Sequence, residues 1–106
     1  MRSMITREHR KLGKKQHREL LALVTRVIAE WDPYALLAGG APRDEFDAEI
    51  ASIVTQVPRI KSATDAADIV SRVFSSSFEP DLFTPEACAQ VGKRLFAELR
   101  ARRFVA

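Results

Sequence analysis

The sequence predicts a small all-α bundle of four main helices, with a short corner helix after Trp31. Apolar residues recur at helical spacing in four separate stretches, and short polar loops join these stretches. The 106 residues include only four glycines and five prolines, too few turn formers for a fold of many short strands. A chain of this length can bury a core without disulfides or metal ions. We therefore expect a helical domain at residues 20–106, preceded at residues 1–19 by a basic arm or a helix extension.

The first helix is expected from about residue 6 to Trp31. Its apolar face starts only at Leu20, because the preceding stretch "ITREHRKLGKKQHRE" is almost entirely polar. From there apolar residues recur at i, i+4, i+7, i+8 and i+11. This face consists of Leu20, Val24, Val27, Ile28 and Trp31.

The segment "EWDPYALLAGGAPRDEFDAEI", residues 30–50, carries several turn and helix-start signals. Asp32 suits the N-cap of the short corner helix, Pro33 suits its first position, and Gly39 suits the left-handed conformation after its end. Asp44 suits the N-cap of the second main helix, which Pro58 should end. The apolar face of that helix consists of Phe46, Ile50, Ile53, Val54 and Val57.

The remaining two helices have their own start signals. Ser62 and Asp65 have the spacing of a capping box, and the face that follows consists of Ala66, Ile69, Val70, Val73 and Phe74. Thr84 suits the N-cap of the last helix and Pro85 its first position. The face of the last helix consists of Cys88, Val91, Leu95, Phe96 and Leu99. The intervening loop carries two aromatic residues that should point inward, Phe78 and Phe83.

Basic segments flank an acidic middle. Residues 1–20 hold seven Lys or Arg against two Glu, residues 21–92 hold five against eleven acidic residues, and residues 93–106 hold five against one. This asymmetry is compatible with nucleic acid, an acidic partner or self-association, and also with ordinary solvated helix faces. The arm could neutralise phosphates, but it has no aromatic residue on which bases could stack. The candidate phosphate contacts are Arg7, Arg10, Lys11, Lys14, Lys15 and Arg18.

The titratable residues form no recognisable catalytic pattern. His9 and His17 lie in the polar arm, and Cys88 lies on an apolar face, where a cysteine behaves as a small hydrophobe. The segment "LAGGAP" lacks the lysine of a phosphate-binding loop. Acidic residues of the middle segment could offer oxygens to a hard cation, but they lie on different helix faces, which favours capping and surface charge instead. These are Asp32, Asp44, Glu45, Asp47 and Glu49. We predict no enzyme, no cofactor and no metal ion.

The sequence also bears on location. No apolar run approaches the roughly 20 residues of a membrane-spanning helix, and the first residues lack the apolar core of a signal peptide. The single cysteine cannot form an internal disulfide. We expect a cytoplasmic protein of bacterial type that does not insert into membranes.

Three segments carry a resemblance to a known family: "WDPYALLAGGAPRDEFDAEI", "VFSSSF" and "CAQVGKRL". In the first segment Trp-Asp-Pro, a Gly-Ala-Pro turn and Asp-Glu-aromatic-Asp follow one another, with Phe46 where a tyrosine is expected. Over roughly residues 23–99 the chain resembles the YugE-like family of small bacterial proteins of unknown function. The resemblance implies a compact helical fold and no established activity, so it assigns no catalytic residue.

We predict a non-enzymatic protein-interaction module, such as an immunity or accessory protein, that uses the surface around residues 30–49. The alternative is a nucleic-acid-associated protein that uses the basic arm and the C-terminal helix. A homodimer is compatible with either prediction. The residues expected to form a structural signature or a partner surface are Trp31, Asp32, Pro33, Gly40, Pro42, Asp44, Glu45, Phe46 and Asp47.

Overall fold

The computed structural model describes residues 13–33, 39–42, 44–78 and 80–105. These residues form four α-helices, α2 (Lys14–Trp31), α3 (Asp47–Gln56), α4 (Ala63–Ser77) and α5 (Ala89–Ala101), and they contain no strand. Two 3-10 turns lie between helices, η2 (Val57–Arg59) and η3 (Pro80–Leu82). The predicted all-α bundle of four main helices is confirmed.

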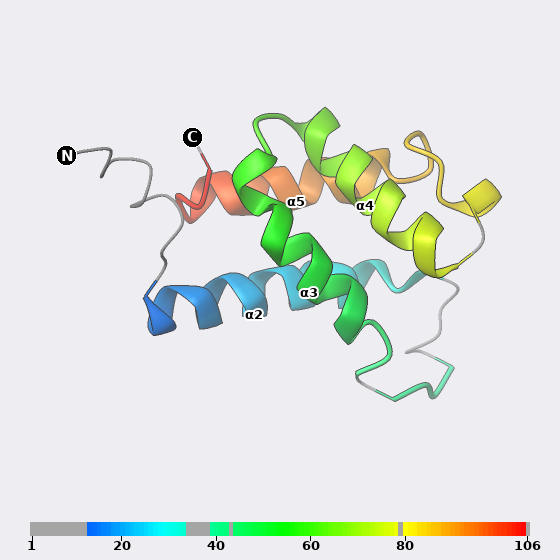
Figure 1. Cartoon of the computed structure of the whole chain (residues 1–106), viewed down its shortest axis with the longest axis horizontal. Coiled ribbons are helices and arrows are strands. Elements are labelled where there is room, and N and C mark those ends of the chain that lie inside the picture. The colour runs from blue at the N-terminus through cyan, green and yellow to red at the C-terminus, as the bar shows by residue number, and fades with distance from the viewer. Residues whose placement is uncertain (1–12, 34–38, 43, 79, 106) are drawn as a thin grey trace.

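The helices are arranged so that the first and last are neighbours. Figure 1 shows α2 and α5 running in opposite directions, with α3 crossing α2 and leading back to α4. The most extensive contact joins α4 to α5, and smaller contacts join α2 to α3, α2 to α5 and α3 to α4. The start of α2 and the end of α5 consequently lie at the same end of the molecule (Figure 1).

The predicted apolar faces form the core. Every residue of the four faces is buried except Trp31 and Phe96, which are partly buried and pack against the core. The structure adds buried residues that the predicted faces omit, among them Leu23, Ile60 and Ala67. The 3.6-residue period therefore identified the inward side of each helix correctly.

Phe74 of α4 is the centre of an aromatic cluster. It is fully buried, and its ring centroid lies 5.1 Å from that of Trp31 and 5.8 Å from that of Phe46. It lies 5.7 Å from Phe78 and 5.4 Å from Phe83, so both loop aromatics point inward as predicted. These spacings are typical of favourable aromatic pairs, and the cluster ties the end of α2 and the start of α3 to α4.

Gly92 allows α4 and α5 to approach closely. A Cβ atom at Gly92 would lie 2.6 Å from the backbone nitrogen of Ala67 and 2.7 Å from its Cα atom. Any larger residue at position 92 would have to push the two helices apart.

The predicted helix start at Ser62 is confirmed by its hydrogen bonds, whereas the predicted start at Thr84 is wrong by four residues, because the N-cap of α5 is Cys88. The Ser62 hydroxyl accepts from the Asp65 backbone N–H at 3.0 Å, while the Asp65 carboxylate accepts from the Lys61 N–H at 2.9 Å. The Thr84 hydroxyl accepts from the Ala87 N–H at 3.1 Å, in a turn that leads into α5. Both side chains satisfy backbone donors that have no partner inside the helix.

The predicted N-cap of the second main helix at Asp44 is wrong by two residues. The Glu45 N–H donates to Pro42 and the Asp47 N–H donates to Asp44, each to the carbonyl three residues earlier. These tight turns place Phe46 at the N-cap of α3, without a side-chain cap. Asp44 is therefore part of the turn before α3.

The corner helix predicted from Pro33 onward lies outside the described residues except for Pro33 itself, which has 3-10 conformation. Asp32 is the C-cap of α2: its φ is 45°, and its N–H donates to the Ile28 carbonyl at 2.8 Å. Gly39 lies in an exposed turn, and Gly40 has a φ of +101°. Asp32 and Gly40 thus occupy the left-handed conformation that asparagine, aspartate and glycine tolerate best.

The first helix is shorter than predicted. Gly13 has extended backbone, and the Gln16 side-chain oxygen accepts from its N–H at 3.0 Å, so α2 begins at Lys14. Residues 14–19 form the largely exposed first turns of α2 and continue into the part that packs on the core. The rest of the basic arm, residues 1–12, lies outside the described residues.

Candidate functional site

A groove of about 310 Å³ lies between α3 and α4. It is lined by four residues of each helix, Ala48, Glu49, Ser52 and Gln56 from α3 and Arg72, Val73, Ser76 and Ser77 from α4.

Glu49 is the unusual residue of this groove. It is only 8% exposed, although ionisable side chains are almost never buried unless they are paired. Among the described residues its carboxylate has no hydrogen-bond or ion-pair partner. An unsatisfied buried polar group in a folded protein calls for an explanation, and binding is one such explanation.

The neighbouring polar groups offer further acceptors. The Gln56 side-chain nitrogen donates to the Ser52 carbonyl at 3.3 Å and to the Ser52 hydroxyl at 3.4 Å. The Ser76 hydroxyl donates to the Arg72 carbonyl at 3.0 Å. Once these donors are engaged, the oxygens of Gln56, Ser76 and Glu49 remain to accept hydrogen bonds from a ligand.

The residues predicted as a signature or partner surface separate into two groups. Phe46 and Pro33 are buried and Trp31 and Asp32 are half-buried, so these residues belong to the core and to the end of α2. The second group is exposed and lies on the turns before α3 or at its first residue, namely Gly40, Pro42, Asp44, Glu45 and Asp47. This exposed acidic turn leads directly into Glu49.

Sequence reasoning treated Glu49 as a surface charge matched to the helix dipole and so missed its burial. The periodic pattern contains the signal that could have found it. Phe46, Glu49, Ile50 and Ile53 stand at i, i+3, i+4 and i+7, the positions that share one helix face. Glu49 therefore lies on the edge of the buried face of α3.

The acidic residues do not assemble a metal centre in the described part of the chain. No group of three or more His, Cys, Asp or Glu side chains gathers there in a way that could hold an ion. Asp44, Glu45 and Asp47 are exposed, whereas Glu49 faces the groove.

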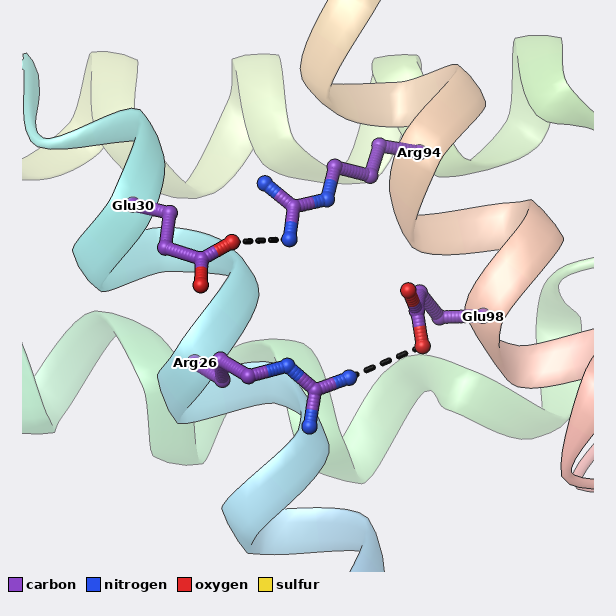
Figure 2. Close-up of polar contacts among 4 residues, drawn as sticks. All are labelled: Arg26, Glu30, Arg94 and Glu98. Atoms are coloured by element: carbon purple, nitrogen blue, oxygen red, sulfur yellow. Dashed lines mark hydrogen bonds and ion pairs between the residues drawn. The ribbon is translucent and has the colours of Figure 1, made fainter.

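Charges of both signs are paired where α2 meets α5 (Figure 2). Arg26 of α2 contacts Glu98 of α5 at 2.8 Å, and Arg94 of α5 contacts Glu30 of α2. The two pairs are reciprocal, because each helix contributes one cation and one anion four residues apart. Their side chains are between 34% and 49% exposed, so they are surface pairs.

The basic residues collect at one end of the bundle. Because α2 and α5 are antiparallel, the first turns of α2 and the last residues of α5 lie at the same end (Figure 1). Exposed cations at this end are Lys14, Lys15, Arg18, Arg100, Arg102 and Arg103. Of the other candidate phosphate contacts, Arg7, Arg10 and Lys11 lie outside the described residues.

The only cysteine is buried as predicted. Cys88 is fully buried at the N-cap of α5, and burial raises the pKa of its thiol to about 11. The reactive form of a cysteine is the thiolate, so this thiol is unsuited to nucleophilic attack near neutral pH. His17 is exposed on α2, and His9 lies outside the described residues.

No described helix is long and apolar enough to cross a bilayer.

Comparison with known proteins identifies one family to which the chain is similar. No curated protein and no solved structure matches the chain. Residues 23–101 match the model of a family described as a domain of unknown function (DUF1871), close to the range of roughly 23–99 over which the sequence suggested a family of unknown function. The chain therefore belongs to this family, the domain of unknown function DUF1871.

Proposed function

We propose that the chain is a non-enzymatic protein-interaction module that binds its partner at the groove between α3 and α4 and at the acidic turn before α3. The observation that supports this proposal is Glu49, a carboxylate 8% exposed and without a partner among the described residues. A buried charge without a partner lowers stability, and such local conflicts concentrate at functional sites.

The exposed residues Asp44, Glu45 and Asp47 extend this surface outward. They give the start of α3 a negative potential, which would guide a basic partner toward the groove. An immunity or accessory protein would use such a surface. We include in the proposal the YugE-like relationship, bacterial origin and a cytoplasmic location, with which the free thiol of Cys88 is compatible.

Site-specific crosslinking tests the proposal. A photo-crosslinking amino acid at Ser77, on the rim of the groove, should capture one discrete protein in cells of the source organism. The same amino acid at Thr25, which is exposed on α2, is the matched control and should capture none. The captured protein is then purified and titrated against Ser77→Trp and Thr25→Trp. We expect Ser77→Trp alone to weaken binding by about tenfold, equivalent to roughly 1.4 kcal/mol. Equal effects of the two substitutions would contradict the proposal.

The second candidate function is binding to nucleic acid at the basic end of the bundle. The antiparallel arrangement of α2 and α5 supports it, because cations from both ends of the sequence gather there (Figure 1). Lys14 and Lys15 also lie at the start of α2, where positive charge is unfavourable for the helix dipole and has no evident structural benefit.

A salt titration with random duplex DNA tests this candidate. If the basic end contacts phosphates, the affinity for DNA should fall steeply as the salt concentration rises. The double variant Lys14→Gln, Lys15→Gln should then reduce the slope of log affinity against log salt concentration by about two. An unchanged slope would eliminate these lysines as phosphate contacts. Light scattering of the purified chain tests separately whether it forms a homodimer.

A further inference from the structure

We infer that the groove between α3 and α4 receives a cationic side chain, a lysine or arginine of the partner protein, and that Glu49 is its counter-charge. This inference rests on the proposed function and specifies the chemistry of the same site. It starts from the one feature of the groove that folding does not explain, a carboxylate that is 8% exposed and has no partner among the described residues.

Glu49 lies in the first turn of α3, at the positive end of the helix dipole. An ionised carboxylate accepts hydrogen bonds and donates none, so its complement is a donor-rich cation. A lysine ammonium or an arginine guanidinium is the donor-rich cation that a protein partner carries.

The surroundings of Glu49 suit such a group. Ser52, Gln56 and Ser76 line the groove with oxygen acceptors that could take the remaining donors of an ammonium or guanidinium group. The volume of about 310 Å³ lies at the lower limit of small-molecule sites, which range from roughly 300 to 1,000 Å³. The groove therefore has room for the end of a lysine or arginine side chain.

Arg72 is the internal alternative to a partner's cation. It lines the groove and is exposed, and it forms no ion pair with Glu49. If its guanidinium swung inward, it would satisfy Glu49 and compete with a ligand. Arg72→Gln should then raise the affinity for an external cation, whereas a direct contact between Arg72 and the ligand would lower it.

The test uses capped single residues as probes. N-acetyl-lysine methylamide and N-acetyl-arginine methylamide are titrated into the ¹⁵N-labelled protein at constant ionic strength. N-acetyl-citrulline methylamide, which is uncharged and close to arginine in shape, is the control probe. We expect amide shifts around Ser52, Gln56 and Ser76 with the two cations, and much smaller shifts with citrulline.

Two isosteric variants decide the assignment. Glu49→Gln should weaken binding of the cationic probes by about tenfold, because it removes the buried half of a charge pair. Glu45→Gln removes an exposed acidic group of the same turn and should change the affinity by less than about twofold. A preserved amide spectrum confirms that each variant is folded.

Several results would overturn the inference: equal weakening by Glu49→Gln and Glu45→Gln, shifts that centre on Asp44 and Asp47, or Glu49→Gln binding as tightly as the parent. Arg72→Gln could also weaken binding of the probes as much as Glu49→Gln does. This result would overturn the inference, because the Arg72 guanidinium would then donate to an acceptor of the probe. Any of these results would leave capture at Ser77 intact, so failure of the inference is distinguishable from failure of the proposed function.

Discussion

The contact between α2 and α5 and the groove between α3 and α4 use the same kinds of residues in opposite ways. At the first, Arg26 pairs with Glu98 and Arg94 with Glu30, and all four side chains remain partly in water (Figure 2). At the second, Glu49 is removed from water and meets no counter-charge among the described residues.

The two regions differ in how their charges affect stability: the exposed ion pairs stabilise the fold slightly, whereas the buried carboxylate of Glu49 destabilises it. Exposed pairs contribute at most about 1 kcal/mol each, since solvent screens them and ordering two long side chains costs entropy. A buried unpaired carboxylate costs stability and is tolerated because the apolar core supplies a surplus. The core should therefore dominate the free energy of unfolding.

Phe74→Ala should give the largest loss. Phe74 is fully buried and its ring meets four other aromatic rings, so the truncation should lower the free energy of unfolding by about 3 to 5 kcal/mol. Denaturant unfolding measures the change, with Phe96→Ala as the control at a partly buried aromatic residue. If Phe96→Ala cost as much as Phe74→Ala, the ranking of the core above the surface would fail.

Gly92→Ala should lower stability by about 1 to 3 kcal/mol, the usual cost of overpacking. The added methyl group would lie 2.7 Å from the Cβ atom of Ala67, and relief would require α4 to move away from α5. Gly13→Ala is the control, because its nearest contact would be the Gln16 side-chain oxygen at 3.5 Å. We expect the control to cost less than about 1 kcal/mol. A stable Gly92→Ala variant would show that the helices can separate at little cost.

Glu49→Met should raise stability by about 1 kcal/mol, since it replaces a buried carboxylate with an apolar side chain of similar length. Loss of a favourable helix-dipole interaction offsets part of the gain by about 0.3 to 1 kcal/mol. Glu45→Met, at an exposed position, should stay within about 0.5 kcal/mol of the parent. Thermal unfolding measures the change. If Glu49→Met were less stable than the parent, Glu49 would stabilise the fold, and the contrast with the ion pairs between α2 and α5 would disappear.

The smallest effect is expected at the ion pairs. A double-mutant cycle with Arg26→Gln and Glu98→Gln should give a coupling free energy of about 0.2 to 1 kcal/mol. The coupling should shrink toward 1 M salt, where the screening length is only about 3 Å. A coupling free energy above about 2 kcal/mol would be typical of a buried salt bridge. The ion pairs could then no longer be contrasted with Glu49 as exposed charges of little energetic weight.

Local signals predicted most of the fold. The apolar faces were correct because helix periodicity relates residues within a few positions of one another. The cap at Ser62 was correct for the same reason, since its hydroxyl accepts from an N–H three residues later. The Thr84 hydroxyl also accepts from an N–H three residues later, but it caps a turn, and α5 begins only after Cys88. The start of α3 was misplaced because Asp44 and Phe46 are separated by tight turns that the capping preference of aspartate does not reveal. The left-handed end of α2 at Asp32 was missed because the aspartate was read only as the start of the next helix.

The sequence by itself determined four amphipathic helices, their inward faces and the start of α4 at Ser62, because these depend on backbone geometry and on residues close in the chain. Only the tertiary structure decided that Gly92 meets Ala67, that Arg26 reaches Glu98, and that Glu49 lines a groove together with residues of α4. Each of these contacts joins residues of different helices, so its existence depends on how the helices cross. Glu49 becomes a candidate site for that reason: the same carboxylate on an isolated helix would be solvated, whereas in the folded chain it is 8% exposed.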